Sequence, residues 1–122
     1  MSKRTSPRIR AMLSKERQAA MPAKGYWIGN TIVHDMDEIF RYRDANRETM
    51  NRYGAKFIIM HGQQEIAEGT ANPTWTVVEF PSYQAAVDCY HDPVYHEAAK
   101  LRHAISEGNM SIVEGYDGTQ DF

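Results

Sequence analysis

The feature that most constrains the fold is a strand–helix–strand pattern that occurs twice along the chain. Short segments rich in aromatic and β-branched residues alternate with longer segments of helical periodicity, in the order β-α-β-β-α-β. The predicted strands are 25–33, 56–61, 75–80 and 109–114, and the predicted helices are 36–53, 83–90 and 93–107. Because the crossovers of such a chain are right-handed, the helices lie on one face of the sheet. The pattern therefore predicts an α+β, ferredoxin-like fold with a four-stranded antiparallel sheet.

Residues that begin and end helices support these boundaries. Asp35 precedes the first helix as an N-cap, with Glu38 three residues later as in a capping box. Gly54 follows that helix at the position where helices commonly end in a left-handed turn. Pro93 stands at the first position of the last helix, where its missing N–H is harmless. The spacing predicts that the buried stripe of this last helix is Val94, Ala98, Leu101 and Ile105.

Both faces of the predicted sheet are apolar. In strand 25–33, Trp27 and Val33 point to one side. Ile28 and Ile32 point to the other side. The helices cover only one face, so a monomer would expose a large apolar patch, which soluble proteins avoid. We therefore expect a homodimer in which two sheets pack face to face.

The formal net charge of −2 hides an uneven distribution. Residues 1–20 carry six basic side chains and one acidic side chain, which leaves eight basic and fifteen acidic side chains in the rest of the 122-residue chain. We interpret residues 1–22 as a basic, flexible or loosely helical extension, 23–115 as the folded domain and 116–122 as a C-terminal tail. Two alternatives are that the extension binds an acidic partner or that it is a transit peptide. Met21 is a plausible second translation start.

Composition argues against several classes of protein. No apolar run approaches the roughly 18–20 residues that a membrane span needs, so we expect a cytoplasmic protein with no membrane partner. The single cysteine, Cys89, excludes an internal disulfide framework and a cysteine zinc site. The five histidines form no zinc-binding motif and no nucleotide-binding glycine motif occurs, so we expect neither a metal nor a cofactor. An acidic body and a strand 75–80 without basic residues argue against nucleic-acid binding.

Three segments of the chain resemble the family of domain of unknown function 1330. They are AKGYWIGNTIVHD from Ala23, VVEFPSYQAAVDCYHDPVYHEAAKLR from Val77, and IVEG from Ile112. The resemblance covers residues 23–115 and implies a dimeric α/β-barrel built from ferredoxin-like subunits. The wider superfamily includes cofactor-free monooxygenases, haem-degrading enzymes, lactone isomerases and proteins that only bind ligands. The family has no assigned activity and therefore implies no catalytic residues.

The last predicted helix supplies the best candidates for chemistry. Tyr95 and Arg102 are seven residues apart and so lie on the same side of the helix, which folds back over the strand that contains Glu79. In the functional interpretation, Arg102 binds a carboxylate or enolate, Tyr95 orients the ligand, and Glu79 is a general base with a raised pKa. In the structural interpretation, Glu79 and Arg102 form a buried ion pair that fixes the helix on the sheet.

Four further residues are candidates. Arg43 and Asn46 lie amid the apolar positions of helix 36–53, where they either contact a ligand or have structural roles. His61 ends its strand near the predicted cavity mouth and is a second candidate acid or base. Trp27 either lines the ligand site or packs in the core or the dimer interface.

Two functional classes remain. One is a cofactor-free enzyme, monooxygenase- or isomerase-like, that acts on a small organic substrate through Glu79, Arg102 and His61. The other is a non-catalytic small-molecule-binding or stress-related dimer that uses the same cavity. The predicted ligand-binding residues in either class are Tyr95, Arg43, Asn46 and Trp27.

Overall fold

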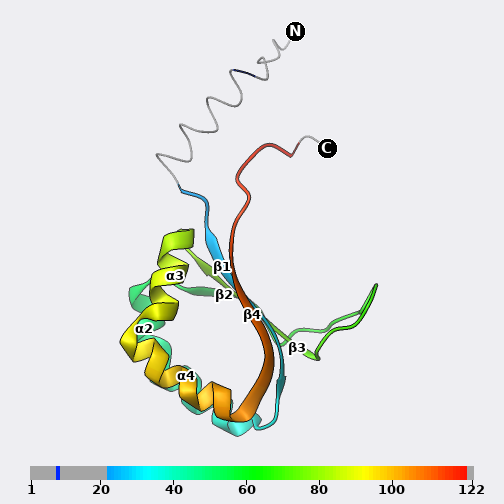
Figure 1. Cartoon of the computed structure of the whole chain (residues 1–122), viewed down its shortest axis with the longest axis vertical. Helices are drawn as coiled ribbons and strands as arrows, with labels where there is room; N and C mark the ends of the chain where they lie inside the picture. Colours follow the sequence, from blue (N-terminus) through cyan, green and yellow to red (C-terminus); the bar gives the residue numbers. More distant parts are fainter. Residues whose placement is uncertain (1–7, 9–21, 121–122) are drawn as a thin grey trace.

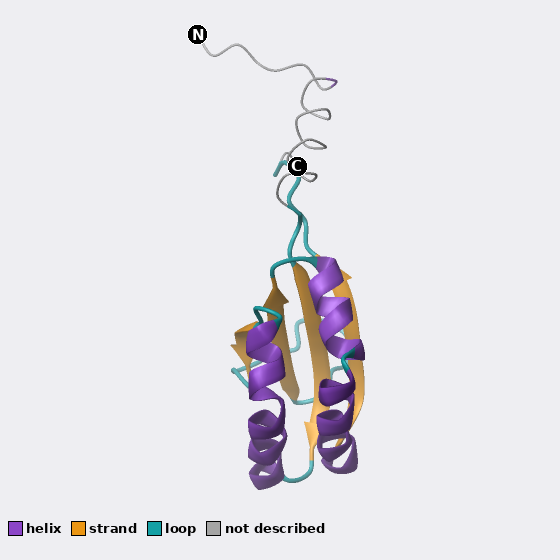
Figure 2. Ribbon diagram, turned by 90° about the vertical axis from the view of Figure 1, so that its left-hand side faces the viewer, coloured by secondary structure: helices purple, strands orange, loops and turns teal. Residues whose placement is uncertain are grey.

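The computed structural model of the chain describes residues 8 and 22–120. A sheet forms one layer, and the helices form a second layer that covers one of its faces (Figures 1 and 2). The strands are β1 (Gly25–Val33), β2 (Lys56–Met60), β3 (Thr74–Phe80) and β4 (Ser106–Glu114), and the helices are α2 (Met36–Arg52), α3 (Tyr83–His91) and α4 (Pro93–Ile105). Apart from Arg8 and Pro22, the predicted basic extension lies outside the described residues.

The sheet confirms the predicted fold class. Its strand order is β2-β3-β1-β4, and every neighbouring pair is antiparallel. The first and third strands therefore lie in the centre, as the ferredoxin-like topology requires. The register pairs Tyr26 with Glu79 and Ile28 with Val77, so these side chains share one face of the sheet.

The boundaries of α2 follow from local hydrogen bonding. The Asp35 carboxylate accepts hydrogen bonds from the backbone N–H groups of Asp37 and Glu38, both at 3.1 Å, which confirms the N-cap. The capping box is not completed, because Glu38 binds Arg41 at 3.1 Å. Gly54 follows the helix with φ +74°, the left-handed conformation that glycine adopts at low cost.

The predicted buried stripe of α4 is wrong at Val94, whereas Ala98 is buried as predicted and Leu101 and Ile105 are half-buried. Tyr95, Ala98 and Ala99 are buried, whereas Val94 is 54% exposed. The helix is turned so that the ring of Tyr95 packs on Trp27, with 4.8 Å between ring centroids. Burying the Tyr95 ring against Trp27 gains more free energy than burying the smaller Val94 side chain would.

The end of α4 also differs from the prediction. The helix ends at Ile105, and β4 begins at Ser106. Gly108 lies inside β4 with φ +138°, and a Cβ atom there would lie 2.4 Å from the backbone oxygen of Asn30. This glycine therefore permits close approach of two strands instead of ending the helix.

An aromatic cluster joins the helices to the sheet. Trp27 is 2% exposed, and its ring centroid lies 4.9 Å from that of Phe80. The Trp27 indole Nε1 donates a hydrogen bond of 2.8 Å to the backbone oxygen of Ala86 in α3. The pairing of a large apolar ring with a satisfied polar group fixes α3 and α4 against the central strand.

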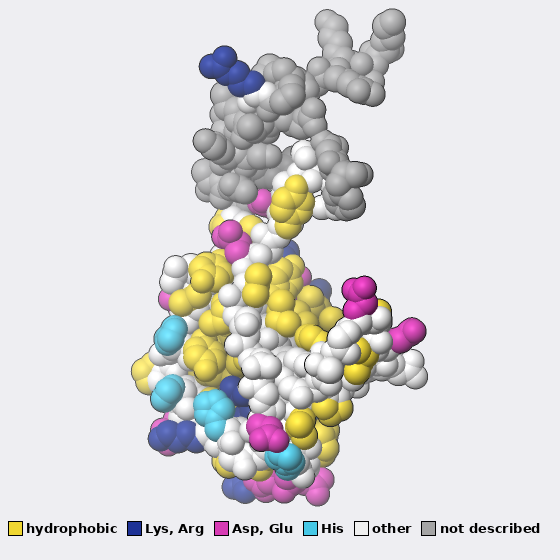
Figure 3. Space-filling view, turned by 45° about the vertical axis from the view of Figure 1, so that its right-hand side comes forward, with side chains coloured by type: hydrophobic (Ala, Val, Ile, Leu, Met, Phe, Trp, Pro, Cys, Tyr) yellow, Lys and Arg dark blue, Asp and Glu magenta, His cyan; other side chains and the backbone are white. Residues whose placement is uncertain are grey.

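The opposite face of the sheet carries no helix among the described residues (Figure 1). The side chains of β1 that point to it belong to Tyr26, Ile28, Asn30 and Ile32, all partly exposed. Figure 3 turns this side of the molecule toward the viewer and shows apolar side chains gathered on it. The loop between β2 and β3 projects away from the helices on the same side (Figure 1). Within the described part of the chain, every helix is too short or too polar to cross a bilayer.

Candidate ligand-binding site

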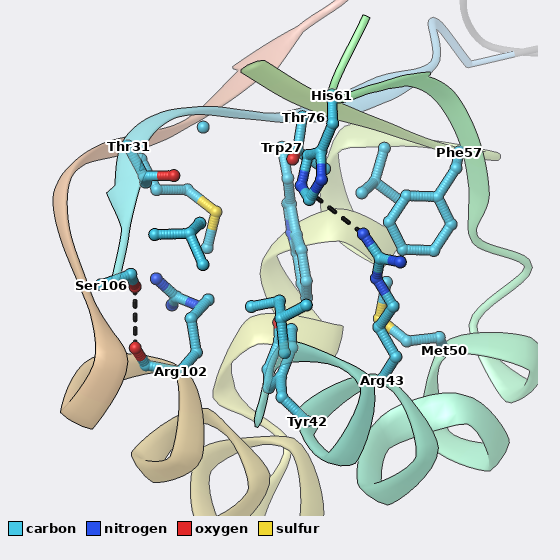
Figure 4. A pocket seen from close by; sticks show the side chains of 15 residues that line it. Trp27, Thr31, Tyr42, Arg43, Met50, Phe57, His61, Thr76, Arg102 and Ser106 are labelled. Atoms are coloured by element: carbon cyan, nitrogen blue, oxygen red, sulfur yellow. Dashed lines mark hydrogen bonds between the residues drawn. The ribbon is translucent and has the colours of Figure 1, made fainter. Parts of the chain in front are cut away.

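A cavity of about 70 Å³ lies between the helices and the sheet face that they cover (Figure 4). Its apolar wall is formed by Trp27, Ile39, Met50, Phe57, Val78 and Met110. The larger polar side chains that line it are Tyr42, Arg43, His61 and Arg102. A mostly apolar cavity with a few converging polar groups is the usual form of a small-molecule site.

Arg43 and His61 point toward each other on one side of the cavity (Figure 4). The Arg43 Nη2 atom lies 3.5 Å from His61 Nε2. Because a guanidinium only donates hydrogen bonds, this contact requires Nε2 to be the unprotonated nitrogen of a neutral imidazole. Burial, and secondly the charge of Arg43, lower the pKa of His61. Its φ of +53° is uncommon for a residue with a side chain.

Two tyrosine hydroxyls meet beneath the cavity. Tyr42 comes from α2 and lines the cavity, whereas Tyr95 comes from α4 and is fully buried. Their hydroxyl oxygens are 2.6 Å apart. Burial raises the pKa of Tyr95 far above its usual value, so this group remains a neutral hydroxyl at physiological pH. Tyr95 was selected from the sequence but Tyr42 was missed, although Tyr42 follows the buried Ile39 by three residues and so lies on the same side of α2.

Arg102 reaches the cavity from the last turn of α4. Its carbon Cζ lies 5.7 Å from the centroid of the Tyr42 ring, and Nη2 donates to His103 Nε2 at 3.2 Å. Among the described residues, the buried Nε–H of Arg102 has no hydrogen-bond acceptor. Burial opposes the charge of Arg102, but interactions with Tyr95 and Tyr42 raise its pKa above the usual value. Arg102 is therefore a permanent positive charge at an apolar cavity.

The predicted pairing of Glu79 with Arg102 is wrong. Glu79 Oε1 binds Lys24 Nζ at 3.0 Å, and Oε2 accepts a hydrogen bond of 3.1 Å from the Tyr26 hydroxyl. These contacts lie on the uncovered face of the sheet, because Glu79 alternates with Val78, which lines the cavity. The hydrogen bond from Lys24 lowers the pKa of Glu79, where a general base would need a raised value.

The remaining predicted residues divide into two groups. Trp27 both lines the cavity and forms the centre of the core. Asn46 is 3% exposed within α2 and is not among the residues that line the cavity. Within the described part of the chain, no group of three or more histidine, cysteine or acidic side chains could hold a metal ion.

Gly29 is a cavity residue that sequence reasoning missed. It lies on β1 between Trp27 and Thr31, on the face that the helices cover. A Cβ atom at this position would meet no backbone or side-chain atom closer than 3.7 Å. By contrast, a Cβ at Gly25 would lie 2.5 Å from the Ser82 backbone oxygen. Gly25 is therefore required by packing, whereas Gly29 leaves space on the cavity wall that packing does not require.

Comparison with known proteins gives a family and a fold. A family model for a domain of unknown function, DUF1330, matches residues 24–116. No curated protein matches the chain. A crystal structure of RPA0582, a protein of unknown function from Rhodopseudomonas palustris, is 18% identical with a TM-score of 0.62, over 93% of this chain and 96% of that chain. The structure of methylated RPA0582 is 17% identical with a TM-score of 0.63, over 93% and 94% of the two chains.

A third similar structure is that of SnoaB, a cofactor-independent oxygenase from Streptomyces nogalater. It is 11% identical with a TM-score of 0.55, over 81% of this chain and 99% of that chain. At these identities, the likeness shows a shared ferredoxin-like fold. Activity must therefore be argued from the cavity itself.

Proposed function

The chain belongs to the family described as domain of unknown function DUF1330, and we propose that it binds a small, mostly apolar organic molecule in the cavity between helices and sheet. The volume of about 70 Å³ is roughly five times the 10–15 Å³ that a cavity needs in order to hold one water molecule. It therefore suits a very small molecule or the end group of a larger one. The polar side chains at its wall would fix the orientation of that group.

The observation that carries this proposal is the glycine on the cavity wall. In a central strand, glycine costs stability relative to residues with side chains because it orders a more flexible backbone and packs nothing. Gly29 has an ordinary strand conformation and room for a Cβ atom. The cavity space beside Gly29 is therefore what this chain gains in return for the lower stability of a glycine in the strand.

The test fills the cavity from this position. Gly29→Val is expected to keep the fold, as judged by circular dichroism, and to abolish ligand-induced chemical-shift changes at Trp27 in an NMR screen of small aromatic and aliphatic compounds. Gly62→Val is the matched control, because a Cβ atom at Gly62 meets nothing within 4 Å. Equal binding by wild type and Gly29→Val would contradict a site in this cavity.

The structure also supports a second candidate function, that of a cofactor-free enzyme which removes a proton from its ligand. The supporting observation is the neutral His61 imidazole, whose Nε2 lone pair faces the guanidinium of Arg43 at 3.5 Å. In the proposed step, the Arg43 guanidinium turns from His61 Nε2 to the ligand oxygen, the ligand C–H bond breaks, its proton moves to the released Nε2 lone pair, and the electron pair moves onto the ligand oxygen. Arg43 would then stabilise the enolate. The cofactor-independent oxygenase SnoaB shares this fold, which is consistent with such chemistry.

Hydrogen–deuterium exchange separates catalysis from binding. Acetophenone is the probe, and loss of its α-hydrogen signal in D₂O is followed by NMR. The wild type is expected to accelerate exchange over buffer, and His61→Asn to reduce the acceleration by about 10²-fold or more. His96→Asn is the control because His96 is exposed on α4. Unaltered exchange in His61→Asn would exclude His61 as the base. If the wild type does not accelerate exchange, the catalytic proposal is wrong and only the ligand-binding proposal stands.

We further propose that the protein is a homodimer whose uncovered sheet faces pack together. In a two-fold interface the same surface patch of both subunits meets, so a patch with unpaired charge of one sign would repel its own copy. Among the positions of β1 and β3 that point to this face, Glu79 is the one charged residue, and Lys24 neutralises it at 3.0 Å. A partner with a charged surface would find no complementary charge at the centre of this face.

Light scattering at known protein concentration tests the dimer. The wild type is expected at twice the mass of the chain, and Ile28→Lys at the mass of one chain with an unchanged circular dichroism spectrum. Val94→Lys is the matched control, since Val94 is 54% exposed on the helical side. A monomeric wild type, or a dimeric Ile28→Lys variant, would contradict this arrangement.

A further inference from the structure

We infer that the cavity selects an organic anion, a carboxylate or an enolate, and that Arg102, Tyr42 and Arg43 recognise its acidic group. This inference rests on the proposed ligand-binding function and adds the chemical class of the ligand.

The charges at the cavity are unbalanced. Three other arginines of α2 have carboxylate partners, namely Arg41 with Glu38, Arg47 with Asp44 and Arg52 with Asp92. Arg43 and Arg102 form no such ion pair within the described part of the chain, and no aspartate or glutamate lines the cavity. Two guanidinium groups at an apolar cavity without a carboxylate leave a net positive charge there. A bound anion would supply the missing partner.

The direction of the tyrosine hydrogen bond adds a third donor. One hydroxyl of the Tyr42–Tyr95 pair must donate to the other across 2.6 Å. If Tyr42 donated, the fully buried Tyr95 hydroxyl would need another acceptor, and the described residues offer it none. A buried donor without a partner costs about 1–3 kcal/mol. Tyr95 therefore donates to Tyr42, and the Tyr42 hydrogen is directed to the cavity.

Two acceptors at the cavity, His61 Nε2 and the Tyr42 oxygen, are already engaged, whereas the neutral hydroxyl oxygens of Thr31, Thr76 and Ser106 remain able to accept. The His61 Nε2 lone pair faces Arg43, and the Tyr42 oxygen accepts from Tyr95. The Ser106 hydroxyl donates to the backbone oxygen of Arg102 (Figure 4). The charged groups that the described lining offers to a ligand are therefore all hydrogen-bond donors, namely the guanidinium groups of Arg43 and Arg102. A carboxylate offers these donors two negatively charged acceptor oxygens, whereas an amide offers one neutral acceptor oxygen and an ammonium offers none.

The apolar wall separates an organic anion from an inorganic one. Phosphate would satisfy the arginines but would leave the surfaces of Trp27, Met50 and Phe57 in contact with water or empty space. A carboxylate attached to a small apolar body would cover these surfaces and gain the free energy of apolar burial.

Matched probes test this inference. Benzoate, benzamide and inorganic phosphate are titrated into the wild-type protein, with binding read from Trp27 indole and backbone amide shifts in NMR spectra. Benzoate is expected to bind about 10-fold or more tightly than benzamide, because it forms charge-assisted hydrogen bonds with the arginines. Phosphate is expected to bind more weakly than benzoate.

Variants locate the recognition. Arg102→Gln is expected to weaken benzoate binding about 10- to 100-fold and to leave benzamide binding unchanged. Arg47→Gln is the control, because Arg47 is exposed on α2 and already forms an ion pair with Asp44. Tyr42→Phe serves as a second variant if Arg102→Gln fails to fold, and it is expected to weaken benzoate selectively.

The outcomes distinguish the two proposals. Equal binding of benzoate and benzamide would overturn anion selectivity but leave the ligand-binding function in place. Phosphate binding as tight as benzoate would overturn an organic ligand. Absence of binding by every probe, together with identical spectra for wild type and Gly29→Val in the wider compound screen, would overturn both.

Discussion

On the sheet face that the helices cover, the cavity holds two arginines that have no carboxylate partner among the described residues, whereas on the uncovered face Glu79 is neutralised by Lys24 at 3.0 Å. The two faces are built from the same strands, and alternate residues of β1 and β3 point to each. The difference arises because α2 and α4 bring Arg43 and Arg102 to one face only. The covered face therefore has a charge that needs a ligand, and the uncovered face is suited to apolar contact.

The largest expected effect tests whether the covered face contains the core. Trp27→Ala removes a 2% exposed ring and its hydrogen bond to Ala86, and it is expected to lower the free energy of unfolding by about 3–5 kcal/mol. Ile28→Ala, one residue away on the other face, is expected to cost about 1 kcal/mol. Urea denaturation at one fixed protein concentration measures both. Equal losses would show that the two faces contribute alike to stability.

A smaller effect separates the packed and hollow parts of the covered face. Gly25→Ala places a Cβ atom 2.5 Å from a backbone oxygen and is expected to cost about 1–3 kcal/mol. Gly29→Ala points into the cavity and is expected to change stability by no more than about 0.5 kcal/mol. Thermal unfolding of both variants beside the wild type provides the measurement. A larger loss at Gly29 than at Gly25 would mean that the cavity is closed by packing.

The smallest effect is the pH dependence of the two faces. The folded-state pKa of His61 lies below its ordinary value of 6.5, so its favourable contribution is present above that pH and is lost as the pH falls. The pKa of Glu79 lies below 4.5, so its contribution persists to lower pH and is lost only in acid. The pH dependence of the melting temperature should therefore flatten below pH 6.5 in His61→Gln and below pH 4.5 in Glu79→Gln. A single common window for both variants would contradict these environments.

Much of the fold could be predicted from the sequence because its signals are local. The cap at Asp35, the left-handed Gly54 and the proline at the start of α4 depend on hydrogen bonds and dihedral angles within a few residues. The rotation of α4 could not be predicted in this way. Its apolar residues run nearly around the helix, so periodicity favoured Val94, and only the contact with Trp27 selected Tyr95.

Most residues of the candidate site could be predicted from the sequence, but the contacts between them could not. Arg43, His61, Arg102 and Trp27 were all selected from the sequence, and all line the cavity. Glu79 was selected with them and lies on the other side of the sheet. Tyr42 and Gly29 were missed, because a tyrosine on an apolar helix face and a glycine in a strand have common structural explanations.

The sequence by itself determined the order of strands and helices, the two apolar faces of the sheet and the residue types available to a site. It also determined that Glu79 points away from Val78 and Phe80, because side chains alternate along a strand. Only the tertiary structure decided which face the helices cover. Since both faces are apolar, alternation cannot distinguish them, and the choice depends on the packing of Trp27, Phe80 and Tyr95 at long range. That packing separates Glu79 from Arg102 and leaves the arginines at the cavity without an acidic partner in the part of the chain that the structure describes.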